Sequence, residues 1–257
     1  MDNYVNTARF YGFDLNSWVS PSTFAITDFD RDGQWELTYT LFDRDGLGAT
    51  AHPIRILEFR DASPPEGVGW IFEPDGSLVD ITAEIFANDP NGIPEISFGR
   101  HMVIKDVNGD GYDDLIVANH GFDRDPFPGG PNIVAVSDGQ GGLVDMAAQF
   151  ETEPGFTHSV AVGDFNGDGR TDFFFGNLNV DNAYFGTLDG ATAVRNSLPL
   201  VPDANRYTRS FASDITGDGL DELFLGGGCQ RARPDGAVDR DRLVGNRPAH
   251  HRVAHHP

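Results

Sequence analysis

Oxygen-bearing side chains alternate along the stretch DFNGDGRTDFFFGN, residues 164–177. Numbered from the first aspartate, positions 1, 3, 5 and 9 are Asp164, Asn166, Asp168 and Asp172. This spacing lets a tightly curled backbone aim several oxygens at one centre, and Gly169 at position 6 supplies a turn that a Cβ would resist. Hard oxygen ligands in this number suit Ca²⁺, whereas Zn²⁺ prefers histidine or cysteine. The stretch therefore predicts a calcium-binding loop.

The pattern occurs in three more places. Each copy has aspartate at positions 1 and 5, an oxygen side chain at 3, glycine at 6 and a carboxylate at 9. The side chains concerned are Asp28, Asp30, Asp32 and Glu36; Asp106, Asn108, Asp110 and Asp114; and Asp214, Thr216, Asp218 and Glu222. An EF-hand needs a glutamate at position 12, where the four copies have Tyr39, Val117, Phe175 and Leu225. The EF-hand interpretation therefore fails, and a repeated cation loop of another kind is predicted.

Short apolar runs flank every loop. TFAIT, HMVIK, HSVAV and SFAS precede the loops, and LTYTLF, DLIVAN, DFFFGN and ELFLGG follow them. Runs this short, rich in β-branched and aromatic residues and bounded by Gly, Asp and Asn, are typical of strands. Each loop is therefore expected to join two strands as a hairpin. A dockerin, whose loop can also read DVNGDG, would need a helix after the loop.

A second hairpin is predicted in each repeat. EPDGSLVDIT (73–82) and VSDGQGGLVDMA (136–147) each hold an Asp-Gly turn followed by Leu-Val-Asp, and LDGATAV (188–194) is a reduced version. The incoming strands are expected at Trp70–Phe72 and Ile133–Val136, with IRILEF as an extra strand near the Pro-rich DASPPEGVG. Two hairpins in about 50–60 residues make one four-stranded propeller blade. The predicted fold class is thus an all-β propeller built from such blades.

Residues 20–226 resemble the FG-GAP/VCBS repeat family, whose calcium-loop blades also occur in the propellers of integrin α-subunits. The resemblance implies one Ca²⁺ per blade, about four in total, held by the side chains at positions 1, 3, 5 and 9 and by the carbonyl at position 7. The position-7 residues are Gln34, Tyr112, Arg170 and Leu220. The fourth loop departs from the family pattern because it has Thr216 and Glu222 at positions 3 and 9.

The expected domain organisation follows from where the repeats stop. Residues 1–226 are predicted to form the propeller segment, and the Arg-, His- and Pro-rich residues 227–257 are predicted to be a disordered tail. The fourth repeat lacks a second hairpin, so we expect about three full blades and part of a fourth in an open arc. Because open ends expose apolar faces, the chain is predicted to self-associate.

Composition narrows the possible partners and locations. The chain has 40 acidic and 18 basic residues and a formal charge of −22, which argues against nucleic acid as a partner because phosphates need a basic surface. A single cysteine excludes an intrachain disulfide framework, and no segment reaches membrane-spanning length. The N-terminus lacks the features of a signal peptide. Even so, loops of this kind fill reliably only in millimolar calcium, so an extracellular or cell-surface location is expected.

Polar side chains near the strand ends form the candidate ligand site. His101, His158 and Arg209 precede three of the loops, and Asn119, His120 and Asn177 end the strands that follow two of them. If the strands before the loops are innermost in each blade, the first three side chains meet at one rim. The sequence contains no GxSxG or HExxH motif, so no catalytic residue is assigned.

Two functions remain open from the sequence. The first is a non-catalytic, calcium-stabilised adhesion or binding module with an unidentified protein or glycan ligand. The second is a carbohydrate-active protein, either a polysaccharide lyase or hydrolase or a lectin, that uses the His and Arg side chains of the rim.

Overall fold

The computed structural model describes residues 19–43, 46–60, 77–149, 154–165, 167–177, 184–189, 192–196 and 208–226. Among the sequence predictions, the strand at Trp70–Phe72, the DASPPEGVG insertion, Asn166 and the 227–257 tail lie outside these residues. The regular secondary structure of the described part is almost entirely β-strand. Its helical elements are α2 (Thr82–Ile85) and a 3₁₀ turn, η1 (Ala147–Gln149). No helix in the described ranges is long and apolar enough to span a bilayer.

Three four-stranded antiparallel sheets and one strand pair follow one another along the chain. The first sheet contains β1 (Val19–Thr27), β2 (Glu36–Asp43), β4 (Arg55–Arg60) and β5 (Ser77–Asp80), and the second contains β7 (Gly99–Lys105), β8 (Asp114–Asn119), β9 (Ile133–Ser137) and β10 (Leu143–Asp145). The third sheet contains β11 (Thr157–Gly163), β12 (Asp172–Asn177), β13 (Tyr184–Asp189) and β14 (Thr192–Asn196). The fourth unit is the pair β15 (Arg209–Ser213) and β16 (Glu222–Gly226).

In each sheet the strands are hydrogen-bonded in chain order, so each sheet is a meander. Every acidic loop joins the first two strands of its unit, as the flanking apolar runs predicted. The second hairpins of the second and third units are present as well, because β9 pairs with β10 and β13 pairs with β14. The predicted all-β class, the four first hairpins and these two second hairpins are therefore confirmed.

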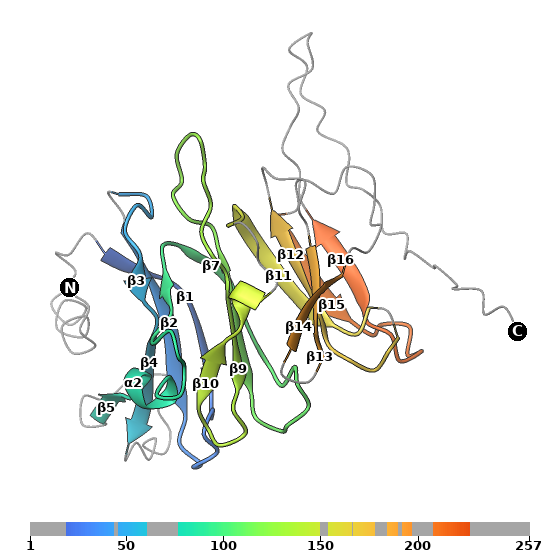
Figure 1. The fold of residues 1–257 in the computed structure, drawn as a ribbon, viewed down its shortest axis with the longest axis horizontal. Helices are drawn as coiled ribbons and strands as arrows, with labels where there is room; N and C mark the ends of the chain where they lie inside the picture. Colours follow the sequence, from blue (N-terminus) through green and yellow to red (C-terminus); the bar gives the residue numbers. More distant parts are fainter. Residues whose placement is uncertain are drawn as a thin grey trace, which may run out of the picture.

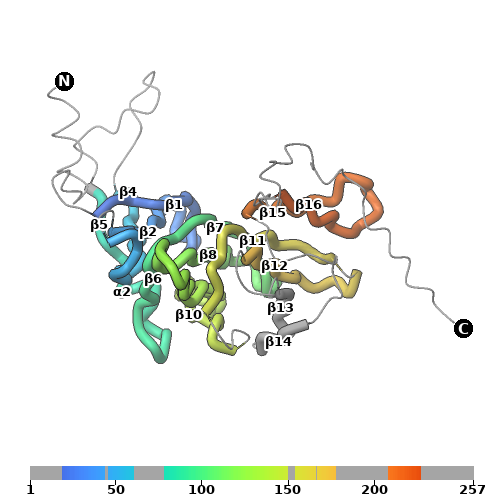
Figure 2. Tube along the Cα trace, turned by 90° about the horizontal axis from the view of Figure 1, so that it is seen from above, coloured from blue at the N-terminus to red at the C-terminus, as the bar shows by residue number. Residues whose placement is uncertain are grey.

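The units stand side by side in a row (Figure 1). Strand β1 contacts β7, β7 contacts β11, and β11 contacts β15, so the first strand of each unit lies beside the first strand of the next. Seen from above, the row runs from the first sheet to the fourth unit, and β1 and β15 lie on opposite sides of β7 and β11 (Figure 2). The described units thus form an open row, with all four loops at one end of the first strands.

One strand prediction for the first sheet was wrong. The run containing β4 was expected to be an extra strand, but β4 pairs with β2 on one side and with β5 on the other. It is therefore the third strand of the sheet, the place assigned to residues 70–72. Sequence proximity was misleading here, because β4 and β5 pair across 16 intervening residues, 61–76. A separate short pair, β3 (His52–Pro53) with β6 (Glu95–Ile96), lies outside the main sheets.

The hydrophobic core lies between neighbouring sheets. Strands β8 and β12 are buried along their whole length, because both faces of each are covered. Phe173 and Phe175 on one face of β12 join Ile116 and Val134 of the second sheet. Phe174 on the other face packs with Leu223 and other apolar residues of the fourth unit. Continuous apolar runs such as DFFFGN are thus explained by burial on both sides.

The two ends of the row leave comparable faces uncovered. Met102 and Ile104, four and two residues before their loop, pack against the buried cluster shared with the preceding sheet. The corresponding residues of β1, Phe24 and Ile26, are 70% and 44% exposed. At the other end, Phe211 of β15 is 61% exposed. Each end therefore presents half of an interface that the chain builds internally between its units.

We predict that these ends cause self-association. Replacing both Phe24 and Phe211 by lysine should shift the protein toward monomer, because a charge on each apolar face opposes the burial that drives association. Sedimentation velocity over a concentration series measures the change. Phe127→Asn, at an exposed residue in the 121–132 connection with φ 54°, is the control. A wild-type protein that stays a compact monomer at every concentration would refute the prediction.

Candidate functional site

All four acidic loops are held in one conformation by their own side chains. The position-1 aspartate accepts a hydrogen bond from the backbone N–H of the position-6 glycine, at 3.1, 2.8, 2.9 and 2.9 Å in the four loops. The position-5 aspartate accepts from the N–H of position 7, at 2.7 to 3.1 Å. Positions 4 and 6 have positive φ in every loop, and Arg31 is the one non-glycine residue among them. The loops are therefore preorganised turns.

The position-9 carboxylate fastens the end of each loop to its beginning. Its oxygen accepts a hydrogen bond from the N–H of position 2: Phe29 to Glu36 at 2.7 Å, Val107 to Asp114 at 2.6 Å, Phe165 to Asp172 at 3.1 Å and Ile215 to Glu222 at 2.9 Å. Three of these carboxylates are buried, while Glu222 is half-buried. The carboxylate at position 9 thus closes the loop, a role that the ligand pattern alone did not reveal.

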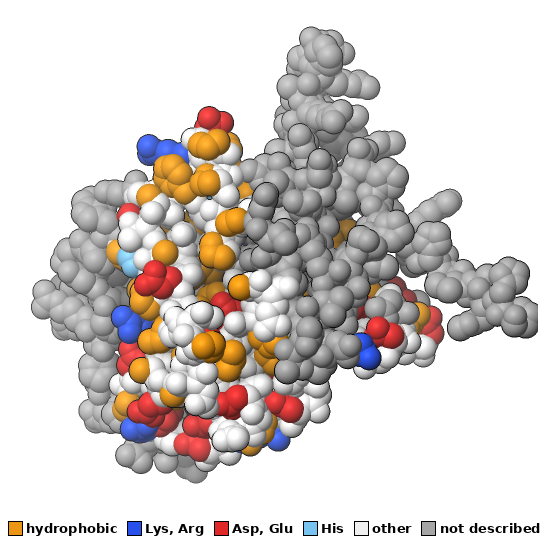
Figure 3. Space-filling model, viewed as in Figure 1, with side chains coloured by type: hydrophobic (Ala, Val, Ile, Leu, Met, Phe, Trp, Pro, Cys, Tyr) orange, Lys and Arg blue, Asp and Glu red, His pale blue; other side chains and the backbone are white. Residues whose placement is uncertain are grey.

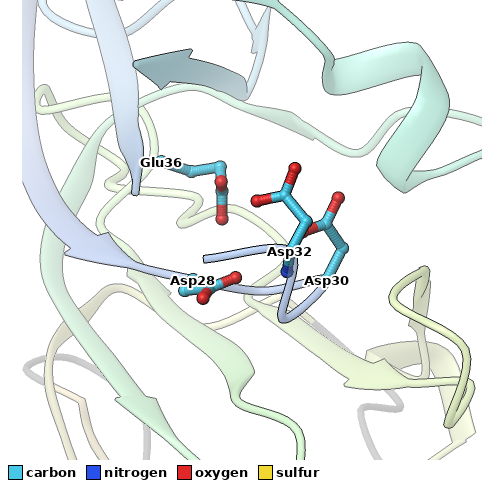
Figure 4. A group of neighbouring side chains, drawn as sticks. All are labelled: Asp28, Asp30, Asp32 and Glu36. Carbon is cyan, nitrogen blue, oxygen red and sulfur yellow. The ribbon is translucent and has the colours of Figure 1, made fainter. Parts of the chain in front are cut away.

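The first loop has the donor set for a cation. Side-chain oxygens of Asp28, Asp30, Asp32 and Glu36 all lie within 4.8 Å of one another, and the four carboxylates surround a common centre (Figure 4). Asp28 Oδ1 and Glu36 Oε1 are buried without a hydrogen-bond partner in the described structure. Buried carboxylate oxygens are costly unless a proton, a donor or a cation compensates them. Because these donors are hard oxygens, the arrangement fits Ca²⁺.

Electrostatics in the first loop favour a positive charge at its centre. Burial raises the pKa of Glu36 to about 7, and Asp30, Asp28 and Asp32 add to the rise by repulsion, while the Phe29 N–H opposes it. Burial also raises the pKa of Asp30, with repulsion from Asp32 and Asp28 contributing. Acidic side chains gather around this end of the units in the space-filling view (Figure 3). A bound cation would relieve the repulsion among these groups.

The other loops vary the same arrangement. In the second, Asp114 accepts from Ser137 N–H as well as from Val107 N–H, both at 2.6 Å, and burial raises its pKa to about 6. In the third loop Asn166 lies outside the described residues. In the fourth loop the Thr216 hydroxyl donates to Glu222 at 3.0 Å. Glu222 has a longer side chain than the aspartates at position 9 of the second and third loops, and its carboxylate therefore reaches the side chain at position 3.

The position-7 residues, whose carbonyls the family resemblance assigns to the cation, all donate their N–H groups to position 5 as described above. Tyr112 has a further contact, because the Arg31 guanidinium lies 4.9 Å from the centre of its ring. This cation–π contact joins position 4 of the first loop to position 7 of the second.

Neighbouring loops are also linked through position 8. Thr27, just before the first loop, donates its hydroxyl to Asp113 of the second. Asp221 of the fourth loop accepts from Asp164 N–H and donates its own N–H to Asp164 C=O, both at 2.9 Å. These two aspartates are not part of the predicted ligand pattern. Their recurrence at position 8 in DVNGDGYDD and DITGDGLDE was the available signal.

A pocket lies at the opposite end of the first strands from the loops. It has a volume of about 460 Å³ and is lined by Arg100, His101, His158, Ser159, Thr208, Arg209 and Ser210. The structure thus brings together His101, His158 and Arg209, which were predicted to meet at one rim. Arg100 and the hydroxyl residues were not predicted. They stand directly beside the selected side chains in the sequence, and neighbouring side chains of a regular strand face opposite sides.

A bulge in each of two strands explains how His158 reaches the pocket. His158 lies six residues before its loop, whereas His101 and Arg209 lie five before theirs. The register of β11 shifts between Thr157 and Ser159, and that of β7 shifts between Gly99 and His101. His158 and Arg100 are therefore the inserted residues of two equivalent bulges, and such insertions redirect side chains.

Asn119, His120 and Asn177 do not line this pocket. Asn119 is buried, accepts from Phe98 N–H at 3.1 Å and Gly121 N–H at 3.0 Å, and donates to Pro131 C=O at 2.8 Å. Asn177 accepts from the Thr157 hydroxyl at 2.6 Å. His120 is buried among aromatic rings. Its ring centre lies 3.8 Å from that of Phe156 and 4.4 Å from that of His158.

The histidines around the pocket are held neutral. Burial lowers the pKa of His158 to about 3, with further depression by His120 and Arg100, and burial lowers that of His120 to about 4. Burial also lowers the pKa of His101, whose Nδ1 accepts from Val160 N–H at 3.2 Å. A neutral imidazole that accepts at Nδ1 carries its proton on Nε2.

These shifts predict acid sensitivity. His120 and His158 have pKa values below the ordinary 6.5 in the fold, so the unfolded chain binds their protons first as the pH falls. Stability should therefore be complete above about pH 6.5 and decline toward pH 4, by up to ~1.4 kcal/mol per pH unit for each histidine. Urea unfolding in saturating Ca²⁺ at pH 7 and pH 5 measures this loss. It should be smaller in His158→Gln, and an equal loss in both proteins would contradict the assignment.

The sequence comparisons agree with the loop geometry in one region. Residues 106–175, which span the second and third loops, match the family model of the FG-GAP-like repeat. Cartilage acidic protein 1 of Homo sapiens is 26% identical over 205 residues, covering 74% of this chain, and the Mus musculus protein is 24% identical over 205 residues. The chain spans only 29% and 30% of the lengths of these relatives.

Two solved structures are similar at low identity. The V. cholerae biofilm matrix protein Bap1 is 17% identical with a TM-score of 0.43, covering 85% of this chain and 30% of that one. The exotype rhamnogalacturonan lyase YesX is 14% identical with a TM-score of 0.41, covering 81% of this chain and 39% of that one.

Proposed function

We propose that this chain, which carries an FG-GAP-like repeat at residues 106–175, is a calcium-binding, non-catalytic binding module built from propeller blades. The observation that carries the proposal is the loop geometry shared by all four repeats. In the first loop it leaves two buried carboxylate oxygens, Asp28 Oδ1 and Glu36 Oε1, without a donor among the described residues. Ca²⁺ would neutralise these groups and stabilise the first hairpin of each unit. The first strands of the units would carry the binding surface.

We place the module in an extracellular or cell-surface protein. With the affinity range of extracellular calcium modules, such loops would be filled in millimolar calcium, and at micromolar concentrations they would stay largely empty. The relatives are named after cartilage, a tissue made largely of extracellular matrix, and this name is compatible with the proposed location.

Each site should act separately, because the ligands of one loop come from contiguous residues. Asp168→Ala removes position 5 of the third loop and should lower the calorimetric stoichiometry by one ion, with a stability loss of about 1 kcal/mol at millimolar Ca²⁺. The Asp164–Asp221 link should survive, because it uses the Asp164 backbone and not the Asp168 side chain. Glu95→Ala, at an exposed acidic residue outside the loops, is the matched control. Loss of all the ions together would contradict separate sites.

The second candidate function is an enzyme acting on polysaccharides, and the pocket containing His101, His158 and Arg209 favours it. A degradation assay on a panel of polysaccharides, with and without Ca²⁺, separates the two candidates. Turnover that is lost in His158→Ala would establish the enzyme. Glycan-array binding without turnover would establish the module.

A further inference from the structure

The pocket at the end of the first strands opposite the loops differs in charge from the rest of the chain. The protein has a formal charge of −22, yet the described lining includes two arginines, Arg100 and Arg209, and no carboxylate. His101 lies five residues before Asp106, so the second acidic loop is roughly 16 Å away along an extended strand. A cationic pocket on an acidic protein concentrates field lines and attracts an anion.

The neutral groups of the pocket can donate and accept the hydrogen bonds that hydroxylated ligands make. Ser159, Thr208 and Ser210 contribute three hydroxyls, and the Ser210 hydroxyl donates to the Ser159 hydroxyl at 3.0 Å. This contact connects β11 to β15 and fixes the spacing between their side chains. His101 adds an Nε2–H, because its Nδ1 accepts from the Val160 backbone.

Strands β7, β11 and β15 supply these groups, with Thr208 directly before β15, so the pocket depends on the packing of the second, third and fourth units. Arg100 is also oriented by stacking, since its guanidinium lies 4.6 Å from the centre of the Phe98 ring. A guanidinium held in this way keeps its planar N–H donors available for a carboxylate. The volume of about 460 Å³ falls in the range of pockets that hold small molecules.

We propose that the pocket binds a hydroxylated carboxylate, of the class of the sugar acids, with its carboxylate between Arg100 and Arg209 and its hydroxyls hydrogen-bonded to the serine and threonine hydroxyls and to His101. This proposal rests on the binding role proposed above but not on the calcium loops. Arg209 neutralises and orients the ligand from the fourth unit, and Arg100 does so from the second. The neutral His101 offers a donor without adding a third charge.

The test compares two probes that differ only at C6, D-glucuronate and D-glucose, by heteronuclear NMR titration of the whole chain in saturating Ca²⁺. We expect glucuronate to shift resonances around the pocket and glucose to bind at least tenfold more weakly. Arg209→Gln and Arg100→Gln should each weaken glucuronate binding about tenfold or more, and Arg124→Gln, in the 121–132 connection, should not. An oligoglucuronate that binds more tightly than the monomer would identify a polysaccharide as the source of the acid, whereas equal affinities would identify a free sugar acid.

Three outcomes would overturn the proposal: equal affinity for glucose and glucuronate, binding unchanged in both pocket variants, or no binding of glucuronate at all. A Ca²⁺ titration of the same sample keeps this test separate from the proposed calcium role. Glucuronate binding in a protein that takes up no Ca²⁺ would refute the calcium loops and leave the pocket assignment standing. Calcium binding without glucuronate binding would refute the pocket assignment and leave the calcium loops standing.

Discussion

Removing calcium is expected to lower the melting temperature by about 8–16 °C. Each site contributes about 1 kcal/mol when free Ca²⁺ is several times its dissociation constant, so four sites contribute about 4 kcal/mol. For a domain of this size, 1 kcal/mol corresponds to a change of about 2–4 °C. The loss should be large because the carboxylates are already gathered: in the first loop their oxygens lie within 4.8 Å of one another, and they repel when no cation is present.

Differential scanning calorimetry in excess EDTA and in millimolar Ca²⁺ measures this change. The melting temperature should return when Ca²⁺ is restored, and Mg²⁺ at the same concentration should restore less of it, because Mg²⁺ dehydrates reluctantly and demands stricter octahedral geometry. Sodium chloride at equal ionic strength controls for general screening of the acidic surface. An unchanged melting temperature in EDTA would exclude a structural role for the loops.

Replacing Phe175 by alanine should cost about 3–5 kcal/mol of unfolding free energy, as truncations of large buried aromatic side chains generally do. Phe175 is fully buried on β12, in the cluster between the second and third sheets. The cavity would open in the middle of the row, where sheets on both sides limit relaxation. Since whole domains have only about 5–15 kcal/mol of stability, this single change should remove a large fraction of the total.

Urea unfolding in saturating Ca²⁺ gives the comparison. Phe211→Ala is the control, because Phe211 is 61% exposed at the end of the row and its truncation should cost less than about 1 kcal/mol. Phe174→Ala tests the other face of β12, which packs on the two-stranded fourth unit. Equal losses for Phe175 and Phe211 would mean that the sheets do not pack in solution as described.

The first hairpin of each unit could be predicted because every signal for it is local. The apolar runs, the glycines and the alternating oxygens all fall within about twenty residues, and the strands pair directly across the loop. Strand β4 was misassigned for the opposite reason. Its partner β5 lies beyond residues 61–76, and the Asp-Gly turn directly before β5 pointed to the nearer residues 70–72 as the partner strand.

The candidate site was predictable in part. The meeting of His101, His158 and Arg209 followed from the expectation that the strands before the loops are neighbours, and the contacts of β7, β11 and β15 provide that proximity. The bulges that turn Arg100 and His158 into the pocket could not be predicted from spacing. An inserted residue changes which side of the sheet the neighbouring side chains face, and it leaves the composition of the strand unchanged. The links through Asp113 and Asp221 were hidden because they join different units.

If each of the four loops holds a calcium ion with its side chains at positions 1, 3, 5 and 9, the ions can be located by the anomalous diffraction of crystals in which Tb³⁺ replaces Ca²⁺. We expect four peaks, one within each loop, and the first should lie among Asp28, Asp30, Asp32 and Glu36. Peaks confined to other acidic surface residues, or loops that stay empty in crystals soaked to saturation, would contradict this expectation.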